Sequence, residues 1–117
     1  MSAAPDPDCL FCRIVAGEIP ATIVAETDHT VAFRDINPQA DVHVLVVPRA
    51  HETDIGSLAA ADPEITIALL AEARRIAESE GHESYRLVFN TGEDAGQTVF
   101  HAHGHVLAGR ALTWPPG

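Results

Sequence analysis

The sequence contains no lysine. Its seven basic residues other than histidine are all arginines, against 17 acidic residues, and the formal net charge is −10. Such a balance disfavours binding to DNA, RNA and anionic membranes, because those partners are held through clustered basic side chains. It does not exclude a small phosphate ligand, since backbone N–H groups and histidines can also hold phosphate. We therefore expect neither a nucleic-acid nor a membrane partner.

Long hydrophobic runs are also missing. No stretch approaches the ~20 apolar residues of a membrane-spanning helix, and the N-terminal MSAAPDPD lacks the basic and apolar regions of a signal peptide. We expect a soluble, cytoplasmic protein with a flexible tail at residues 1–8 and one domain at residues 9–117. A chain of 117 residues leaves much of its surface exposed, which is compatible with a dimer.

Cysteine is scarce, and the two cysteines present, Cys9 and Cys12, form a C-x-x-C motif. In a reducing compartment this spacing is more typical of metal binding or redox chemistry than of a structural disulfide. A redox motif of the thioredoxin kind would need a βαβ context, which the sequence pattern does not offer. Two unlinked thiols remain a third interpretation.

The hydrophobic pattern predicts an α+β fold with a mainly antiparallel, five-stranded sheet. A short helix is expected over residues 9–15. One long helix is expected to begin after Asp62 as N-cap, with Pro63 in its first turn, and to end near Gly81. The five strands are expected at residues 23–26, 30–34, 42–47, 85–90 and 99–107.

The last of these segments carries three histidines, His101, His103 and His105, which alternate with small residues. On an extended strand they would share one face, with Cβ atoms of successive histidines about 6.5–7 Å apart. Three such imidazoles do not comfortably meet one tetrahedral ion. One histidine could join a metal while its neighbour offers a neutral ring nitrogen as a nucleophile. An exposed histidine-rich strand is the alternative.

The loop TGEDAGQT at residues 91–98 comes just before the histidines. It is not a Walker A motif, because it lacks G-K-[ST] and a strand is expected after it instead of a helix. Successive backbone N–H groups near Gly96 could still turn toward an anion. An ordinary surface turn explains the loop equally well.

Three segments together resemble the histidine triad (HIT) family, whose mark is H-φ-H-φ-H-φ-φ with φ apolar. They are LFCRIVAGEIPA, AFRDINPQADVHVLVVPRAH and FNTGEDAGQTVFHAHGHVLAGR. The C-terminal segment RALTWPPG resembles the C-terminus of the Hint branch, the histidine triad nucleotide-binding proteins. The resemblance covers roughly residues 9–117 and implies a single HIT domain.

The resemblance implies an enzyme that binds purine nucleotides of the AMP or GMP kind. It would hydrolyse purine nucleoside 5′-phosphoramidates, such as adenosine 5′-monophosphoramidate, through a nucleotidyl-histidine intermediate and without Mg²⁺. His103 falls on the nucleophile of the family, and His101, His105 and His43 fall on the histidines beside it. A homodimer is also implied, in which the C-terminal tail with Trp114 approaches the site of the partner.

The resemblance also implies a set of substrate contacts. The base would lie between apolar side chains, the ribose would be held by a carboxylate, and the phosphate would meet the loop before the histidines. Taken alone, most of these residues are explained as simply by a core or a turn. The implied contacts are Phe11, Ile14, Phe33, Asp35, Ile36, Asn90, Gln97, Thr98, Val99 and Trp114.

In zinc-bearing members of the wider family the metal ligands fall on Cys9, Cys12, His51 and His101. This Cys₂His₂ set suits a closed, tetrahedral structural zinc. His51 could instead be an exposed loop histidine. Two departures from the family pattern stand out: Thr98 replaces a common serine, and Gly104 replaces an apolar residue, which is expected to weaken the strand and loosen the third histidine.

Two other functions remain open at this point. One is a dinucleoside polyphosphate hydrolase of the same family. The other is a nucleotide- or zinc-binding interaction protein with negligible turnover, which Gly104 would favour. Turnover of adenosine 5′-phosphoramidate beside diadenosine polyphosphates separates the three.

Overall fold

A computed structural model describes residues 4–117, so residues 1–3 of the expected N-terminal tail lie outside the described residues. The expected α+β fold with a five-stranded sheet is confirmed. The elements in chain order are α1 (Leu10–Val15), β1 (Ile23–Glu26), β2 (Thr30–Arg34), β3 (Val42–Pro48), α2 (Ile55–Ala61), α3 (Pro63–Ser79), β4 (Arg86–Val88), the 3₁₀ turn η1 (Glu93–Ala95) and β5 (Gly104–Ala108).

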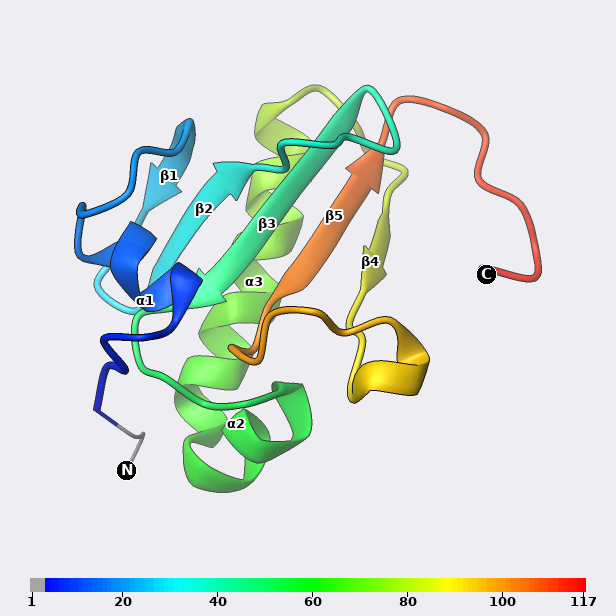
Figure 1. Cartoon of the computed structure of the whole chain (residues 1–117). Helices are drawn as coiled ribbons and strands as arrows, with labels where there is room; N and C mark the ends of the chain where they lie inside the picture. Colours follow the sequence, from blue (N-terminus) through cyan, green and yellow to red (C-terminus); the bar gives the residue numbers. More distant parts are fainter. Residues whose placement is uncertain (1–3) are drawn as a thin grey trace.

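The sheet has the order β1-β2-β3-β5-β4, and every neighbouring pair is antiparallel. The long helix α3 lies across one face, and the short helix α1 lies against the other (Figure 1). Side chains alternate between the two faces along β3. Val44 and Val46 belong to the core beneath α3, whereas Leu45 and Val47 join a smaller core around Phe11 of α1. β3 is therefore buried throughout.

The long helix begins as its sequence predicts. Asp62 accepts a hydrogen bond from the Ile65 amide (3.1 Å), and Pro63 occupies the first turn. The helix ends at Ser79, and Gly81 follows with a φ of +89°, a conformation that favours glycine. The sequence pattern did not predict α2, because that helix has seven residues and buries only Leu58.

The last two strands are shorter than predicted. β4 covers Arg86–Val88 instead of residues 85–90, and β5 begins only at Gly104. Residues 99–103 lie outside the sheet, and the Ala102 amide donates a hydrogen bond to Glu52 O (2.7 Å) in the loop after β3. The prediction that three histidines line one straight strand is therefore wrong. Of His101, His103 and His105, only His105 lies in a strand.

Among the described residues, no helix is both long enough and apolar enough to cross a membrane.

Candidate functional site

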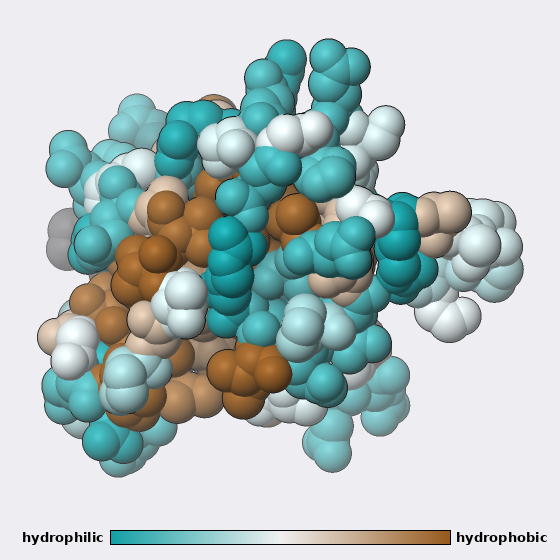
Figure 2. Space-filling model, turned by 90° about the horizontal axis from the view of Figure 1, so that it is seen from above, coloured by the Kyte–Doolittle hydropathy of each residue, from teal (hydrophilic) through white to brown (hydrophobic). Residues whose placement is uncertain are grey.

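A cavity of about 750 Å³ opens between α1, the segment after it and the uncovered face of the sheet. Figure 2 shows hydrophobic residues gathered over the side opposite the protruding C-terminal tail, which is the side that carries α1, β1 and β2 (Figure 1). Its lining combines apolar side chains with two histidines. Nine sequence-predicted residues line it: Phe11, Ile14, Phe33, Asp35, Ile36, Thr98, Val99, His103 and His105.

The cavity wall also contains residues that the sequence analysis did not single out. Most come from α1 and the segment after it, and the family-like LFCRIVAGEIPA stretch was the signal that could have pointed to them. The others flank predicted residues on β2 and β3. They are Leu10, Ile19, Pro20, Ala21, Thr22, Arg34 and Leu45.

Three predicted substrate contacts do not line this cavity: Asn90, Gln97 and Trp114. The Gln97 side chain is buried and braces the loop instead. Its amide nitrogen donates to Thr53 O (2.7 Å) and Val99 O (3.1 Å), and its amide oxygen accepts from the Gly92 amide. Trp114 is 83% exposed on the C-terminal tail, which extends away from the sheet (Figure 1). Their roles toward a substrate stay predictions.

The buried imidazole of His103 stands where α1 meets the histidine segment. The edge of the His103 ring meets the Phe11 ring at a centroid distance of 5.0 Å. Its Nδ1 lies 2.7 Å from His101 O, so that nitrogen must carry the proton and donate it. Burial lowers the pKa of His103 and favours the neutral ring. The remaining lone pair of this neutral imidazole is therefore on Nε2.

Two further histidines lie beside His103: His43 on β3 and His105 on β5, which hydrogen-bond to each other. The Gln39 amide donates to His43 Nδ1 (3.0 Å), so a neutral His43 carries its proton on Nε2. That proton is donated to His105 Nδ1 at 2.9 Å, which leaves the His105 proton on Nε2. Burial lowers the pKa of His105 to about 4. His105 is thus a neutral hydrogen-bond donor beside the nucleophile candidate.

Asp35 lies near the same pair. Its Oδ2 is 3.5 Å from His43 Nε2, and its other oxygen accepts a hydrogen bond from the Asn37 amide (2.8 Å). The carboxylate therefore borders both the cavity and the histidine pair. The family resemblance implied roles for Asp35 and His43, but the Gln39 amide that orients His43 was not predicted.

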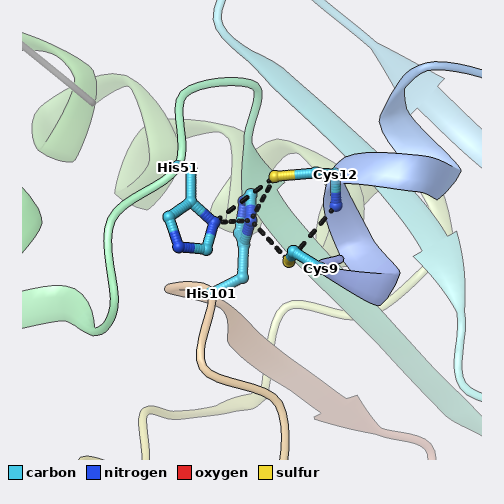
Figure 3. A group of neighbouring side chains, drawn as sticks. All are labelled: Cys9, Cys12, His51 and His101. Atoms are coloured by element: carbon cyan, nitrogen blue, oxygen red, sulfur yellow. Dashed lines mark hydrogen bonds between the residues drawn. The ribbon is translucent and has the colours of Figure 1, made fainter. Parts of the chain in front are cut away.

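The four candidate metal ligands meet at the N-terminus of α1 (Figure 3). Cys9 is the N-cap of α1, so the C-x-x-C spacing turns both thiols to one side of its first turn. His51 comes from the loop after β3, and His101 comes from the segment before β5. The ligand atoms of all four residues lie within 4.8 Å of one another.

The individual distances suit a tetrahedral ion. Cys12 Sγ lies 3.3 Å from His51 Nδ1 and 3.4 Å from His101 Nδ1, and the two Nδ1 atoms are 3.2 Å apart. Bonds of about 2.0–2.3 Å to nitrogen and sulfur correspond to ligand–ligand distances of roughly 3.3–3.8 Å. The His101 Nε2 proton is donated to Pro48 O (2.8 Å), so the Nδ1 lone pair faces the thiols. This group could therefore hold a metal ion.

His101 belongs to both parts of the site. Its ring faces the two cysteines and His51, while its backbone carbonyl accepts the His103 proton. His101 therefore connects the cysteine–histidine group to the carbonyl that sets the His103 tautomer.

Side-chain packing explains why residue 104 is a glycine. A Cβ atom built on it would lie 2.9 Å from both Cε1 and Cζ of Phe89 and 3.0 Å from Leu87 Cδ1. The Phe89 ring thus takes the space that a side chain at residue 104 would need. The strand is regular here, with Gly104 paired to Val46, and His105 is held by His43. The expected loosening of the third histidine is not observed.

Comparison with known proteins gives a consistent result. The HIT domain family matches residues 16–112. A 14 kDa zinc-binding protein of Brassica juncea is 42% identical over 113 residues, which cover 94% of this chain and 100% of that protein. An uncharacterized HIT-like protein of Synechococcus elongatus is 47% identical over 111 residues, which cover 94% of this chain and 97% of that protein.

Solved structures agree. The crystal structure of a HIT family hydrolase from Legionella pneumophila superimposes with a TM-score of 0.89 at 47% identity, covering 94% of this chain and 100% of that one. A HIT family hydrolase from Clostridium thermocellum superimposes with a TM-score of 0.88 at 39% identity, covering 92% of this chain and 96% of that one.

Proposed function

The chain belongs to the HIT family, and on that premise we propose that it is a nucleotide-binding hydrolase of purine nucleoside 5′-phosphoramidates. The substrate would be a compound such as adenosine 5′-monophosphoramidate, and the product a nucleoside monophosphate. The observation that carries the proposal is His103: it lines the cavity with Nδ1 bound to a backbone carbonyl and its lone pair on Nε2. The hydrolase neighbours support the reaction class.

The cavity offers a separate place for each part of such a substrate. The base would lie between the apolar side chains of Phe11, Ile14, Phe33 and Ile36, and the ribose hydroxyls would meet the Asp35 carboxylate. The phosphate would then lie at His103 and His105, near Thr98 and Val99. This order follows the polarity of the lining.

The chemistry follows from the two tautomers. The His103 Nε2 lone pair attacks phosphorus, a nucleotidyl-histidine bond forms, and the P–N bond breaks as the amine leaves with a proton from solvent. The His105 Nε2–H donates to a phosphoryl oxygen and stabilises its charge. Water then attacks the phosphorus, releases the nucleoside monophosphate, returns a proton to solvent and restores neutral His103. The scheme requires no Mg²⁺.

The test is the release of AMP from adenosine 5′-phosphoramidate. His103→Ala removes the attacking nitrogen, and we expect its turnover to fall by about 10³-fold or more. His29→Ala, an exposed histidine on the turn between β1 and β2, is the matched control and should retain turnover. Undiminished turnover in His103→Ala would rule out the mechanism.

The same assay separates the alternatives. Faster cleavage of diadenosine polyphosphates than of the phosphoramidate would favour the dinucleoside polyphosphate hydrolase. Tight nucleotide binding with negligible turnover of either substrate would favour an interaction protein.

We also propose that the Cys₂His₂ group holds a structural Zn²⁺, which when bound would tie α1, the loop after β3 and the His101 segment together. The distances given above fit the ion, and relatives named as zinc-binding proteins support it. Elemental analysis of protein purified without a histidine tag should find about one zinc per chain, and much less in Cys12→Ser. Less than about a tenth of an equivalent in the wild type would contradict the site.

The proposal includes a homodimer. β4 is an edge strand, α3 exposes Ile67 and Leu70, and the extended tail would carry Trp114 toward the cavity of a partner chain. Light scattering should give about twice the 12.5 kDa chain mass. The mass of a single chain at micromolar concentration would contradict the dimer.

A further inference from the structure

Gln97 is a polar residue in the interior: it is 2% exposed, and a buried polar atom needs a hydrogen-bond partner. A glutamine amide nitrogen carries two N–H donors. Both are used here, one on Thr53 O (2.7 Å) and one on Val99 O (3.1 Å), while the amide oxygen accepts from the Gly92 amide (2.9 Å). The side chain therefore has no N–H group left to donate to a ligand.

The bond to Val99 has a local consequence. Val99 comes two residues after Gln97, so the Gln97 side chain closes a ring that contains the backbone N–H groups of Thr98 and Val99. The Val99 carbonyl cannot turn without breaking this bond, and the peptide groups inside the ring are held with it. Thr98 and Val99 both line the cavity that His103 also lines. One buried side chain thus fixes the backbone of two residues in the cavity wall.

The other contacts anchor this ring to two neighbouring segments. Thr53 lies in the loop after β3, and the carbonyl of its neighbour Glu52 accepts from the Ala102 amide (2.7 Å). Residues 52–53 therefore hold the segment 97–102 near both of its ends. On the other side, the Gln97 amide donates to Gly92 O (3.0 Å), opposite the bond from the Gly92 amide to the Gln97 side chain. These two bonds close the loop around η1.

We propose that Gln97 is a positioning residue, which preorganises the Thr98 and Val99 amides as donors to the phosphate and acts on the substrate through them. This inference rests on the nucleotide-binding function proposed above and deepens it. Donors that are already in place stabilise charge on a phosphate without having to be ordered when the ligand arrives. None of the three side-chain bonds of Gln97 reaches Phe11 or Asp35, where the base and ribose would lie. Loss of the brace should therefore weaken the phosphate contacts alone.

Two probes separate the phosphate from the rest of the ligand: AMP and adenosine. Both carry the base and the ribose, but only AMP has a phosphate. Isothermal titration of the full chain gives the Kd of each. A general loosening of the fold would weaken both ligands, whereas displacement of the Thr98 and Val99 amides would weaken AMP only.

Two substitutions remove the brace. Gln97→Met keeps the length of the side chain and removes all three of its hydrogen bonds. Gln97→Glu keeps an oxygen for the Gly92 amide but, as a carboxylate, cannot donate to Thr53 O or Val99 O. In both we expect AMP affinity to fall by about tenfold, the order of one lost hydrogen bond to a charged group, and adenosine affinity to stay within about twofold. Gln97→Glu alone decides the test if Gln97→Met does not fold.

Thr30→Val is the matched control. Thr30 is 1% exposed, its hydroxyl pairs with Thr27 Oγ1 (2.7 Å), and it does not line the cavity. The substitution removes a buried hydrogen bond at the start of β2, so it should leave both affinities at the wild-type level. Denaturant unfolding of each variant gives the stability with which the affinities are compared.

The outcomes distinguish this inference from the function on which it rests. AMP affinity that is unchanged in the Gln97 variants, or AMP and adenosine affinities that fall equally, overturns the positioning role and leaves nucleotide binding standing. A selective loss of AMP affinity in Thr30→Val as well also overturns it. A wild type that binds neither AMP nor adenosine overturns both proposals.

Discussion

Each of the three histidines in HAHGH has its protonated nitrogen set by a hydrogen bond. His101 donates from Nε2 to Pro48 O, and His103 donates from Nδ1 to His101 O. His105 accepts on Nδ1 from His43. As a result one ring turns a lone pair to the cysteines, one has a free lone pair on Nε2, and one has a free N–H. Three histidines thus acquire three different chemical roles, although their side chains are the same.

Gly104 allows a test at the same scale. Gly104→Ala would place a methyl group 2.9 Å from the Phe89 ring, and we expect the free energy of unfolding to fall by about 1–3 kcal/mol, as for other overpacked cores. Denaturant unfolding measures it. In a Phe89→Leu background the same change should cost less, because the ring edge is gone. An equal cost in both backgrounds would contradict the packing explanation.

At the scale of elements, α1 depends on tertiary contacts. A helix of six residues is too short to be stable alone in water. Its Phe11 ring packs edge-on against Phe33 at a centroid distance of 5.4 Å, and its first turn carries Cys9 and Cys12. The element that closes the cavity is therefore held in place by the small core and by the cysteine–histidine group.

Helix α3 offers a prediction about an element that the sequence specifies locally. Asp62→Ala removes the acceptor of the Ile65 amide, and we expect a loss of about 1 kcal/mol in the free energy of unfolding. Asp62→Ser should lose less, because its hydroxyl can cap the helix. Asp28→Ala, an exposed turn residue, serves as the control. A cost for Asp62→Ala no larger than that of the control would argue against the cap.

For the whole molecule, burial of His105 links stability to pH. Its pKa falls from 6.5 to about 4 in the folded chain, where His43, His103 and Asp35 surround it. Above pH 6.5 neither state binds the proton, so there is no contribution. Between pH 6.5 and 4 the unfolded chain binds a proton that the folded chain does not. Stability therefore falls as the pH falls through this window.

We expect the free energy of unfolding to decrease less steeply between pH 6.5 and 4 in His105→Asn than in the wild type. Urea unfolding at a series of pH values measures both slopes. Other acid-sensitive groups, including the cysteine–histidine group, remain in both chains, so the difference in slope reports His105. Identical slopes would contradict the assignment. His29→Asn provides an exposed-histidine control.

Several features could be predicted from the sequence because short-range chemistry specifies them. Asp62 and Pro63 mark a helix start by capping and by the fixed φ of proline, and β2 lies where its pattern predicts it. The metal group was predicted from the C-x-x-C spacing together with the family resemblance, and the structure brings its four members together. The path of residues 99–103 was not predictable, because it depends on a hydrogen bond to Glu52.

The sequence by itself determined the long helix with its cap, the order of the five strands and the apolar alternation of β3, since propensity and side-chain type act locally. Only the tertiary structure decided what the site residues can do. The proton positions on the histidines depend on Gln39, Pro48 and the His101 carbonyl, and the space for Gly104 depends on Phe89. Contacts between distant segments cannot be deduced from local preferences.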